Sequence, residues 1–123
     1  MNLDLSNKIA VVCGSTQGIG LAAAKELDLL GATLVLVARN EEKLKGIVQE
    51  LDSDGSKGHS YIVVDFSFPE ELKTKMTQFA ASSDVHILVN NTGGPAGGLA
   101  INAGTSEFED AFRNHLICNH ILV

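Results

Sequence analysis

Residues 8–20 read KIAVVCGSTQGIG, an apolar run that passes directly into a glycine-rich turn. The run over residues 8–13 is short and rich in β-branched side chains, which is typical of a strand buried on both faces. After the turn, apolar residues recur at helical spacing over residues 18–30, and Gly31 is placed to end that helix. The stretch therefore predicts a strand, a glycine-rich turn and a helix in direct succession.

The turn has the spacing Gly-x-x-x-Gly-x-Gly. Glycines between a strand and a helix let the backbone approach a phosphate closely. The N-terminus of the helix adds free N–H groups and the positive end of the helix dipole. We therefore expect the turn to hold the phosphates of a dinucleotide, with the candidate residues Gly14, Ser15, Thr16, Gln17, Gly18, Ile19 and Gly20. The alternative is a tight turn whose glycines only permit positive φ.

Strand and helix patterns alternate along the rest of the chain. Buried-strand patterns lie at residues 33–38, 61–64 and 85–89, and helical patterns at 41–51, from 67 to about 81, and from 106 onward. The last two helices open with capping-box spacings, Ser67 with Glu70 and Ser106 with Glu109, and the first of them also has Pro69 in its first turn. Parallel strands need crossovers, which place helices on both faces of the sheet. The pattern predicts a Rossmann-type α/β fold, a doubly wound parallel sheet of four βα units.

The composition narrows the class of protein. A chain of 123 residues has room for one domain over residues 1–123. Fifteen acidic against nine basic residues give a net charge of −6, which argues against nucleic acid as a partner. No apolar run approaches the roughly 20 residues needed to cross a bilayer. Cys13 and Cys118 are far apart and suggest neither a disulfide framework nor a metal site, so we expect a cytoplasmic protein without a bound metal.

The glycine spacing resembles that of the short-chain dehydrogenase/reductase family, and the resemblance covers the whole chain. Gly14, Gly18 and Gly20 match the family's cofactor glycines. Cys13 stands where the family usually has threonine, a change that leaves the mainly backbone contacts to phosphate in place.

Two further motifs carry the resemblance. Asp65 follows the third predicted strand and matches the family's adenine-contacting aspartate; its alternative is an acid at a helix N-terminus near Ser67. Residues 90–93, Asn-Asn-Thr-Gly, look like the family's Asn-Asn-Ala-Gly motif, with Thr92 in place of alanine. The resemblance implies that Asn90 ties down backbone at the strand end. It also implies cofactor contacts from Asp65, Phe66, Asn91, Thr92 and Gly93, with the loop over residues 91–104 as a mobile rim.

The end of the second predicted strand bears on which nicotinamide cofactor is used. An acidic residue there usually bonds the ribose hydroxyls of NAD. This chain has Ala38 followed by Arg39, whose planar guanidinium suits a 2′-phosphate. We therefore expect NADP(H) to be favoured over NAD(H). The alternative is that Arg39 is a solvated loop residue that pairs with Glu41 or Glu42.

The family's catalytic Tyr-x-x-x-Lys pair is not among these 123 residues. The one tyrosine, Tyr61, starts a predicted strand and is followed four positions later by Asp65, so we expect it to be a packing residue. The family's catalytic Asn precedes a leucine on the helix after the fourth strand. Here His115 stands at that place and Asn114 one position earlier, which makes both low-ranking catalytic candidates; the alternative for His115 is packing beside Phe112.

The resemblance implies an oxidoreductase that interconverts a small carbonyl compound and an alcohol by hydride transfer. The last residues, 121–123, are apolar and carry no helix stop signal, so we expect an amino-terminal, non-catalytic portion of a longer enzyme with its final helix cut. The alternative is a naturally short nucleotide-binding or regulatory module. We also expect a homo-oligomer, because residues 85–89 would form an apolar sheet edge that a second copy pairs or the final helix covers.

Overall fold

The computed structural model describes residues 1–95 and 97–123. Its sheet has four parallel strands, β1 (Ile9–Cys13), β2 (Thr33–Ala38), β3 (Ser60–Val63) and β4 (Ile87–Val89). Their order across the sheet is β3-β2-β1-β4, so the direction of winding switches between β1 and β4. In open α/β sheets, ligands bind outside the carboxyl ends of the strands at such a switch. The predicted fold class is confirmed.

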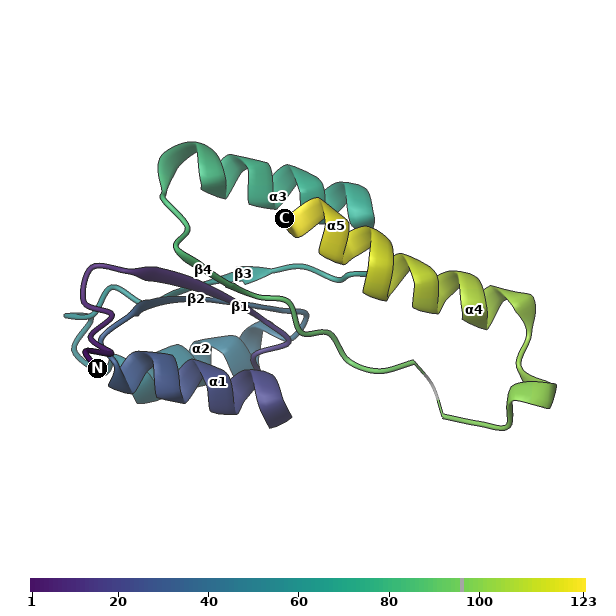
Figure 1. Ribbon diagram of the computed structural model, residues 1–123, viewed down its shortest axis with the longest axis horizontal. Coiled ribbons are helices and arrows are strands. Elements are labelled where there is room, and N and C mark those ends of the chain that lie inside the picture. The colour runs from purple at the N-terminus through teal and green to yellow at the C-terminus, as the bar shows by residue number, and fades with distance from the viewer. Residues whose placement is uncertain (96) are drawn as a thin grey trace.

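Helices cover both faces of the sheet, as Figure 1 shows. One face carries α1 (Gly18–Leu29) and α2 (Glu41–Leu51), and the other carries α3 (Pro69–Ser82) and α5 (Cys118–Leu122). Before α5 come a short 3₁₀ helix, η1 (Ala100–Asn102), the helix α4 (Thr105–Phe112) and a π-helical stretch, η2 (Arg113–Ile117). α4, η2 and α5 form one continuous rod, and its α4 end projects past the sheet (Figure 1).

The central strand β1 is buried on both faces, as its composition predicts. Ala10 and Val12 belong to the core layer under α1 and α2, while Val11 and Cys13 belong to the layer under α3 and α5. All four side chains are fully buried. Complete burial of a valine or leucine side chain stabilises a fold by about 1.5–3 kcal/mol. β1 is therefore a firm base for the turn that follows it.

The start of α3 differs from the capping-box prediction at Ser67 and Glu70. The helix begins at Pro69 with Phe68 as its N-cap residue, and no described side chain caps it. Proline favours the first helical position, because its missing N–H needs no partner there. The Ser67 N–H instead bonds Asp65, so this box was a wrong prediction.

The start of α4 also differs from its prediction, which paired Ser106 with Glu109. The helix begins one residue earlier, at Thr105, after an extended Gly104. Gly104 donates its N–H to the Glu107 carboxylate at 2.7 Å. An acid at the third helical position thus reaches the N-cap backbone, which shifts the box by two residues from the predicted place.

β4 is an edge strand that pairs, among the described residues, with β1 alone. The final helix does not cover this edge. α5 contacts α3, and its Ile121 and Leu122 are partly buried against the core layer on that face. The expectation of a final helix folded over the edge was therefore wrong, because these apolar side chains pack on the face of the sheet. Pairing with a second copy stays a prediction.

A network of polar side chains, which the sequence pattern did not predict, lies at the amino end of the sheet. His59 lies directly before β3; its Nδ1 accepts the Leu34 N–H at 3.2 Å, and its Nε2 lies 2.9 Å from Asp28 Oδ1. With Nδ1 accepting, Nε2 carries the proton and donates it to Asp28. Lys57 Nζ lies 2.8 Å from the same carboxylate, and Asp52 accepts the N–H groups of Lys57 and His59 at 3.0 Å each. The network joins α1 and α2 to the starts of β2 and β3.

Both carboxylates of this network have lowered pKa values. Burial opposes the charge of Asp28, but the hydrogen bonds from Lys57 and His59, together with the charge of Lys57, outweigh it and hold its pKa below the usual range. At Asp52, hydrogen bonds from the backbone N–H groups of Lys57 and His59 lower the pKa despite the cost of burial. The folded state therefore favours the ionised form of both groups.

Candidate functional site

A groove of about 490 Å³ lies at the carboxyl ends of the strands. Four segments line it, each at or after the carboxyl end of a strand: residues 14–19 except Ser15, residues 37–40, residues 64–67 and residues 91–94. Lys43 and Asn114 complete the lining. The topology thus brings together, in one groove, segments that are up to 100 residues apart in sequence.

The glycines of the first turn have three different geometric roles. Gly14 has φ +59°, and a Cβ built on it would lie 2.6 Å from both the Nδ2 and the backbone oxygen of Asn91. Gly18 has φ +56°, and a Cβ there would meet nothing within 4 Å, so its side of the turn is open. A Cβ on Gly20 would overlap the Gly14 carbonyl oxygen. The turn therefore needs glycine for left-handed backbone at two positions and for close packing at the third.

The remaining turn residues divide into those that face the groove and one that lies beneath it. Thr16, Gln17 and Ile19 line the groove, and the Ile19 side chain is 80% exposed. Ser15 is fully buried, and its Oγ has no hydrogen-bond partner among the described residues. Nor does any described side chain cap α1 at its N-cap residue, Gln17. The first N–H groups of α1 thus remain available to an anion in the groove.

Asn91 holds the end of β4 against the turn. Its Nδ2 donates to the carbonyl oxygens of Cys13 and Gly14 at 3.3 and 3.4 Å. The sequence reasoning gave this role to Asn90, and that was wrong: Asn90 is exposed. Asn91 is instead part-buried, and its amide reaches the backbone at the end of β1.

Arg39 lines the groove at the end of β2 and is exposed. Its predicted alternative was an ion pair with Glu41 or Glu42. Within the described part of the chain both glutamates instead pair with Lys45, at 3.4 and 3.6 Å. The guanidinium is thus left facing the groove without a carboxylate partner among these residues.

Lys43 is a lining residue that the sequence reasoning missed. It lies in the first turn of α2, where its backbone N–H bonds the Oδ1 of the N-cap residue Asn40 at 3.0 Å. This cap fixes the start of α2, from which Lys43 lines the groove together with Arg39. The sequence does carry a signal for this lysine. Asn40, directly after Arg39, is a favoured N-cap residue and so sets where α2 begins, which puts Lys43 in the first helical turn on the side of the groove.

Asp65 and Phe66 line the groove after β3. Asp65 Oδ1 accepts the Ser67 N–H at 2.8 Å, so the turn that was the alternative interpretation of this acid coexists with its place in the groove. The Phe66 carbonyl accepts a hydrogen bond from Cys118 Sγ at 3.1 Å, a link between this loop and the final helix. Burial raises the pKa of the Cys118 thiol, which keeps its proton on sulfur for this bond.

Thr92 and His115 are joined by a hydrogen bond of 2.6 Å between Oγ1 and Nδ1. Thr92 lines the groove together with Gly93, whereas His115 does not. His115 lies in the π-helical stretch η2, and its carbonyl accepts the Asn119 Nδ2 at 2.7 Å. The sequence reasoning singled out both Thr92 and His115 as departures from the family pattern but missed that they contact each other.

Asn114 lines the groove from the same stretch. Its Oδ1 is buried and has no partner within the described residues. Stretches of π-helix inside α-helices are frequent at functional sites, since the extra residue re-aims nearby side chains. Of the two catalytic candidates on this helix, the structure thus places Asn114, and not His115, in the groove.

Tyr61 lies in β3 outside the groove. Its ring packs against the core layer under α1 and α2, and its hydroxyl donates to Glu41 Oε1 at 3.1 Å. Desolvation and the Glu41 carboxylate raise the pKa of this hydroxyl. The prediction that Tyr61 is a packing residue is confirmed. Cys13 is equally inert, because burial raises the pKa of its thiol to about 12.

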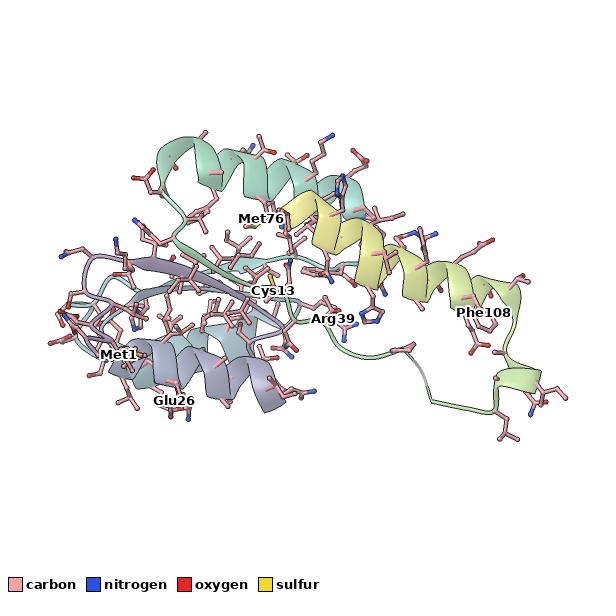
Figure 2. The ribbon with its side chains drawn as sticks, viewed as in Figure 1. Met1, Cys13, Glu26, Arg39, Met76 and Phe108 are labelled. Carbon is pink, nitrogen blue, oxygen red and sulfur yellow. The ribbon has the colours of Figure 1, made fainter. Side chains whose placement is uncertain are left out.

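The predicted rim over residues 91–104 lines the groove only at its start, residues 91–94. Further along, Leu99 and Ile101 are 70% and 90% exposed around η1. Ala96, which also falls in the predicted rim, lies outside the described residues. Figure 2 shows the Arg39 side chain at the junction between the sheet and the final rod, and Phe108 far out on that rod.

Among the described residues 1–95 and 97–123, no helix has the length and apolar character needed to cross a membrane. The same residues contain no cluster of three or more histidine, cysteine or acidic side chains suited to a metal ion.

Comparison with known families gives a match to short chain dehydrogenases over residues 8–117. The match includes all four segments that line the groove, as well as Lys43 and Asn114.

Known proteins resemble the chain at moderate identity. A human protein named inactive hydroxysteroid dehydrogenase-like protein 1 is 40% identical over 84 residues, which cover 68% of this chain and 26% of the relative. A 7alpha-hydroxysteroid dehydrogenase from Clostridium sardiniense is 34% identical over 111 residues, 89% of this chain and 42% of the relative. L-sorbose reductase from Gluconobacter frateurii, solved with NADPH and L-sorbose, superposes with a TM-score of 0.85 at 29% identity, over 99% of this chain and 47% of that one. The chain spans less than half the length of each.

Proposed function

The chain belongs to the short-chain dehydrogenase family, and on that premise we propose that its groove binds a nicotinamide dinucleotide for an oxidoreductase of this type. The observation that carries the proposal is the turn formed by residues 14–20. Its backbone is open at Gly18, and it leads into a helix without a side-chain cap among the described residues. These features suit a pyrophosphate, which has only acceptor oxygens and negative charge to offer.

The residues present fit such a cofactor along the length of the groove. The turn and the N-terminus of α1 would hold the pyrophosphate, Asp65 would accept a hydrogen bond from the base, and Asn91 keeps the turn in place by its bonds to Cys13 and Gly14. When bound, the nicotinamide ring supplies the hydride that interconverts a carbonyl compound and an alcohol. This chain's part is to bind and orient that cofactor.

NADP(H) is favoured over NAD(H) in this proposal. Arg39 and Lys43 both line the groove near the end of β2, where Ala38 replaces the acid that would bind the ribose hydroxyls of NAD. Two cations that form no ion pair with a carboxylate among the described residues suit the 2′-phosphate, the group by which the two cofactors differ. The Gluconobacter relative, a protein solved with NADPH, supports the same preference by analogy.

Titration of the chain with NADPH and NADH, read by nicotinamide fluorescence, tests both parts of the proposal. We expect tighter binding of NADPH, and R39A should weaken it by roughly 10–100-fold while leaving NADH almost unchanged, because only the 2′-phosphate loses its partner. K45A is the matched control, since Lys45 pairs with Glu41 and Glu42 and does not line the groove. Tighter binding of NADH than of NADPH would contradict the preference.

His115 acts in this proposal as a positioning residue. It stands at the place of the family's catalytic asparagine, yet it does not line the groove and holds Thr92, which does. Its role is therefore to fix the loop after β4 over the cofactor.

A second candidate function, nucleotide binding without catalysis, is favoured by one specific observation. A relative 40% identical over its matched segment bears the word inactive in its name, and the 123 residues contain no Tyr-x-x-x-Lys pair. The two functions differ in the reading frame of the transcript. Continuation past Val123 into a Tyr-x-x-x-Lys pair supports the enzyme, whereas a stop codon directly after Val123 supports the binding module.

The proposal also includes a homo-oligomeric assembly and a cytoplasmic location. Phe108, Phe112 and Leu116 lie four residues apart on the rod and are each more than half exposed, which supports a homo-oligomer that covers them. Light scattering coupled to gel filtration measures the oligomeric state directly, and a monomer at all concentrations would contradict the proposed oligomer.

Two buried, unpaired thiols, Cys13 and Cys118, support a cytoplasmic location.

A further inference from the structure

The π-helical stretch η2 displaces the hydrogen-bond ladder of the rod by one residue. In an α-helix the N–H of Cys118 would bond the carbonyl four residues earlier, but here it bonds the carbonyl of Arg113. A shift of this kind leaves a carbonyl near it without its regular partner, and an inward-facing carbonyl without a hydrogen bond is unfavourable. The stretch is therefore a place where a side chain can decide the local conformation.

Asn119 supplies such a side chain. Its Nδ2 donates to the carbonyl of His115, four residues earlier, at 2.7 Å. Its Oδ1 is buried and has no partner among the described residues, which makes the amide an unfavourable choice for packing alone. An apolar side chain of similar shape would avoid the unsatisfied acceptor, so the donated hydrogen bond is the contact that accounts for an amide at this position.

His115 connects Asn119 to the groove. Its ring Nδ1 lies 2.6 Å from Thr92 Oγ1, and Thr92 lines the groove, whereas neither His115 nor Asn119 does. The imidazole belongs to the backbone segment whose carbonyl Asn119 holds, and a shift of that segment by one residue would turn the ring by about 100° around the rod axis. Such a turn would take the ring away from Thr92. The direction of the ring therefore depends on the conformation that Asn119 stabilises.

We propose that Asn119 is a positioning residue for the groove, because by holding the His115 carbonyl it keeps the imidazole in place for its hydrogen bond to Thr92. The proposal rests on the dinucleotide-binding function put forward above and adds a residue outside the groove that controls one segment of its lining. Asn119 itself touches no ligand in this arrangement. Its effect reaches the loop after β4 through two hydrogen bonds in series, one between Asn119 and His115 and one between His115 and Thr92.

The chain offers a matched pair of variants for the test. Thr74 in α3 donates its hydroxyl to the Glu70 carbonyl at 2.9 Å, so a threonine in a helix of this protein bonds the carbonyl four residues earlier. N119T should restore a donor to the His115 carbonyl in the same way, whereas N119V has the same branched shape without the hydroxyl. T74V is the control, since it removes the equivalent bond from an exposed residue that does not line the groove. N119A, with a better helix former, replaces N119V should that variant fail to fold.

The first readout is the nitrogen NMR signals of the His115 ring, recorded at one fixed pH without cofactor and assigned by comparison with H115A. T92V supplies the signals of a ring that has lost its hydroxyl partner. N119V should shift the His115 signals toward those of T92V, whereas N119T and T74V should leave them close to wild type. A general loss of stability would not move the signals of the folded protein in this direction, so this readout is specific to positioning.

The second readout is the dissociation constant of NADPH, taken from nicotinamide fluorescence. N119V should weaken binding by about threefold, because the loop after β4 loses the same support as in T92V. The double variant N119V/T92V should bind no more weakly than T92V alone, since both substitutions act on one hydrogen bond. N119T and T74V should bind NADPH as wild type does.

The outcomes distinguish this inference from the proposed function. If N119V leaves the His115 signals unchanged, or if N119T shifts them as N119V does, the inference about Asn119 is overturned and the dinucleotide groove stands. Additive losses of NADPH affinity in N119V and T92V would overturn it as well. If folded wild type binds no NADPH at millimolar concentration, the dinucleotide-binding function fails, and the NMR comparison alone decides whether Asn119 positions the ring.

Discussion

The two ends of the sheet carry polar clusters of opposite character. At the amino end, Asp28 and Asp52 accept hydrogen bonds from Lys57 and His59, and His59 also accepts one from the backbone of Leu34. Every member has a partner within the chain, and the two carboxylates have lowered pKa values as a result.

At the carboxyl end, several polar groups remain without partners among the described residues. Ser15 Oγ and Asn114 Oδ1 are buried and unbonded, Arg39 faces the groove, and α1 begins without a side-chain cap. Buried polar groups in folded proteins are almost always satisfied, so two unsatisfied ones, Asn114 in the groove lining and Ser15 beneath the glycine turn, support the proposed binding of a ligand at this end. The comparison separates polar residues that hold the fold together from polar residues that are kept for binding.

The largest expected effect on binding comes from a substitution of Gly14, at the carboxyl end of the sheet. In G14A the new methyl group would lie 2.6 Å from Asn91 atoms and the residue would keep a left-handed φ, so the turn has to move. We expect cofactor binding to weaken by about 100-fold, which corresponds to about 2.7 kcal/mol. Fluorescence titration with NADPH measures it.

G46A is the matched control for this substitution. Gly46 lies inside α2, and a Cβ there meets nothing within 4 Å. Alanine should therefore stabilise the helix by about 0.5–1 kcal/mol and leave binding unchanged. Wild-type affinity in G14A would contradict the proposed role of the turn.

The next largest effect, on stability, comes from a substitution of Asp28 in the polar network at the amino end of the sheet. D28N removes the charge that Lys57 and His59 face, and it should lower the free energy of unfolding by about 2 kcal/mol. Thermal or urea unfolding measures the loss. E50Q is the matched control: it removes an exposed pair with Lys25 and should cost less than about 0.5 kcal/mol. The ratio of NADPH to NADH affinity should stay the same in both variants.

The same carboxylate makes stability depend on pH. The pKa of Asp28 lies below its ordinary value of 3.8 in the folded state. Its stabilising contribution is therefore complete above that value and is lost as the pH falls through the folded pKa. We expect D28N to unfold with a shallower dependence on pH below about pH 4 than wild type. Equal slopes in the two proteins would argue against an ionised Asp28 as the centre of the network.

The smallest expected effect concerns the hydrogen bond between Thr92 and His115. T92V and H115A should each weaken NADPH binding by roughly threefold, and the double variant by no more than either alone, since both remove one hydrogen bond. A double-mutant cycle should thus give a coupling energy of about 0.7 kcal/mol. T74V, which loses only a bond to the Glu70 carbonyl within α3, serves as the control. Additive effects would show that the two residues act separately.

The fold was largely predictable from the sequence because its signals are local. Buried parallel strands need continuous apolar runs, and residues 33–38 match β2 at both ends. The helix starts were harder to place, since Ser67 and Pro69 each offer a way to begin α3 and only the geometry of the chain decides between them. Here the proline at the first helical position prevailed over the capping box.

The site was predictable where backbone geometry alone defines it and less so where side chains from distant segments meet. The glycines of the turn follow from spacing, but the partners of His59 come from three separate segments, and Thr92 and His115 are 23 residues apart. Likewise, only the assembled groove shows that Asn91, and not Asn90, reaches β1. Contacts of this kind depend on tertiary structure, which no local pattern encodes.

The π-helical stretch over Arg113–Ile117 sets an angular offset within the rod. Each residue of an α-helix advances about 100° around the axis, so one additional residue in a turn rotates everything after it by about that angle. Before the stretch, Phe108 and Phe112 are each more than half exposed; after it, Cys118 is fully buried in a core layer of the sheet. A single surplus residue thus separates a half of the rod that carries exposed aromatic side chains from a half that is seated on the sheet.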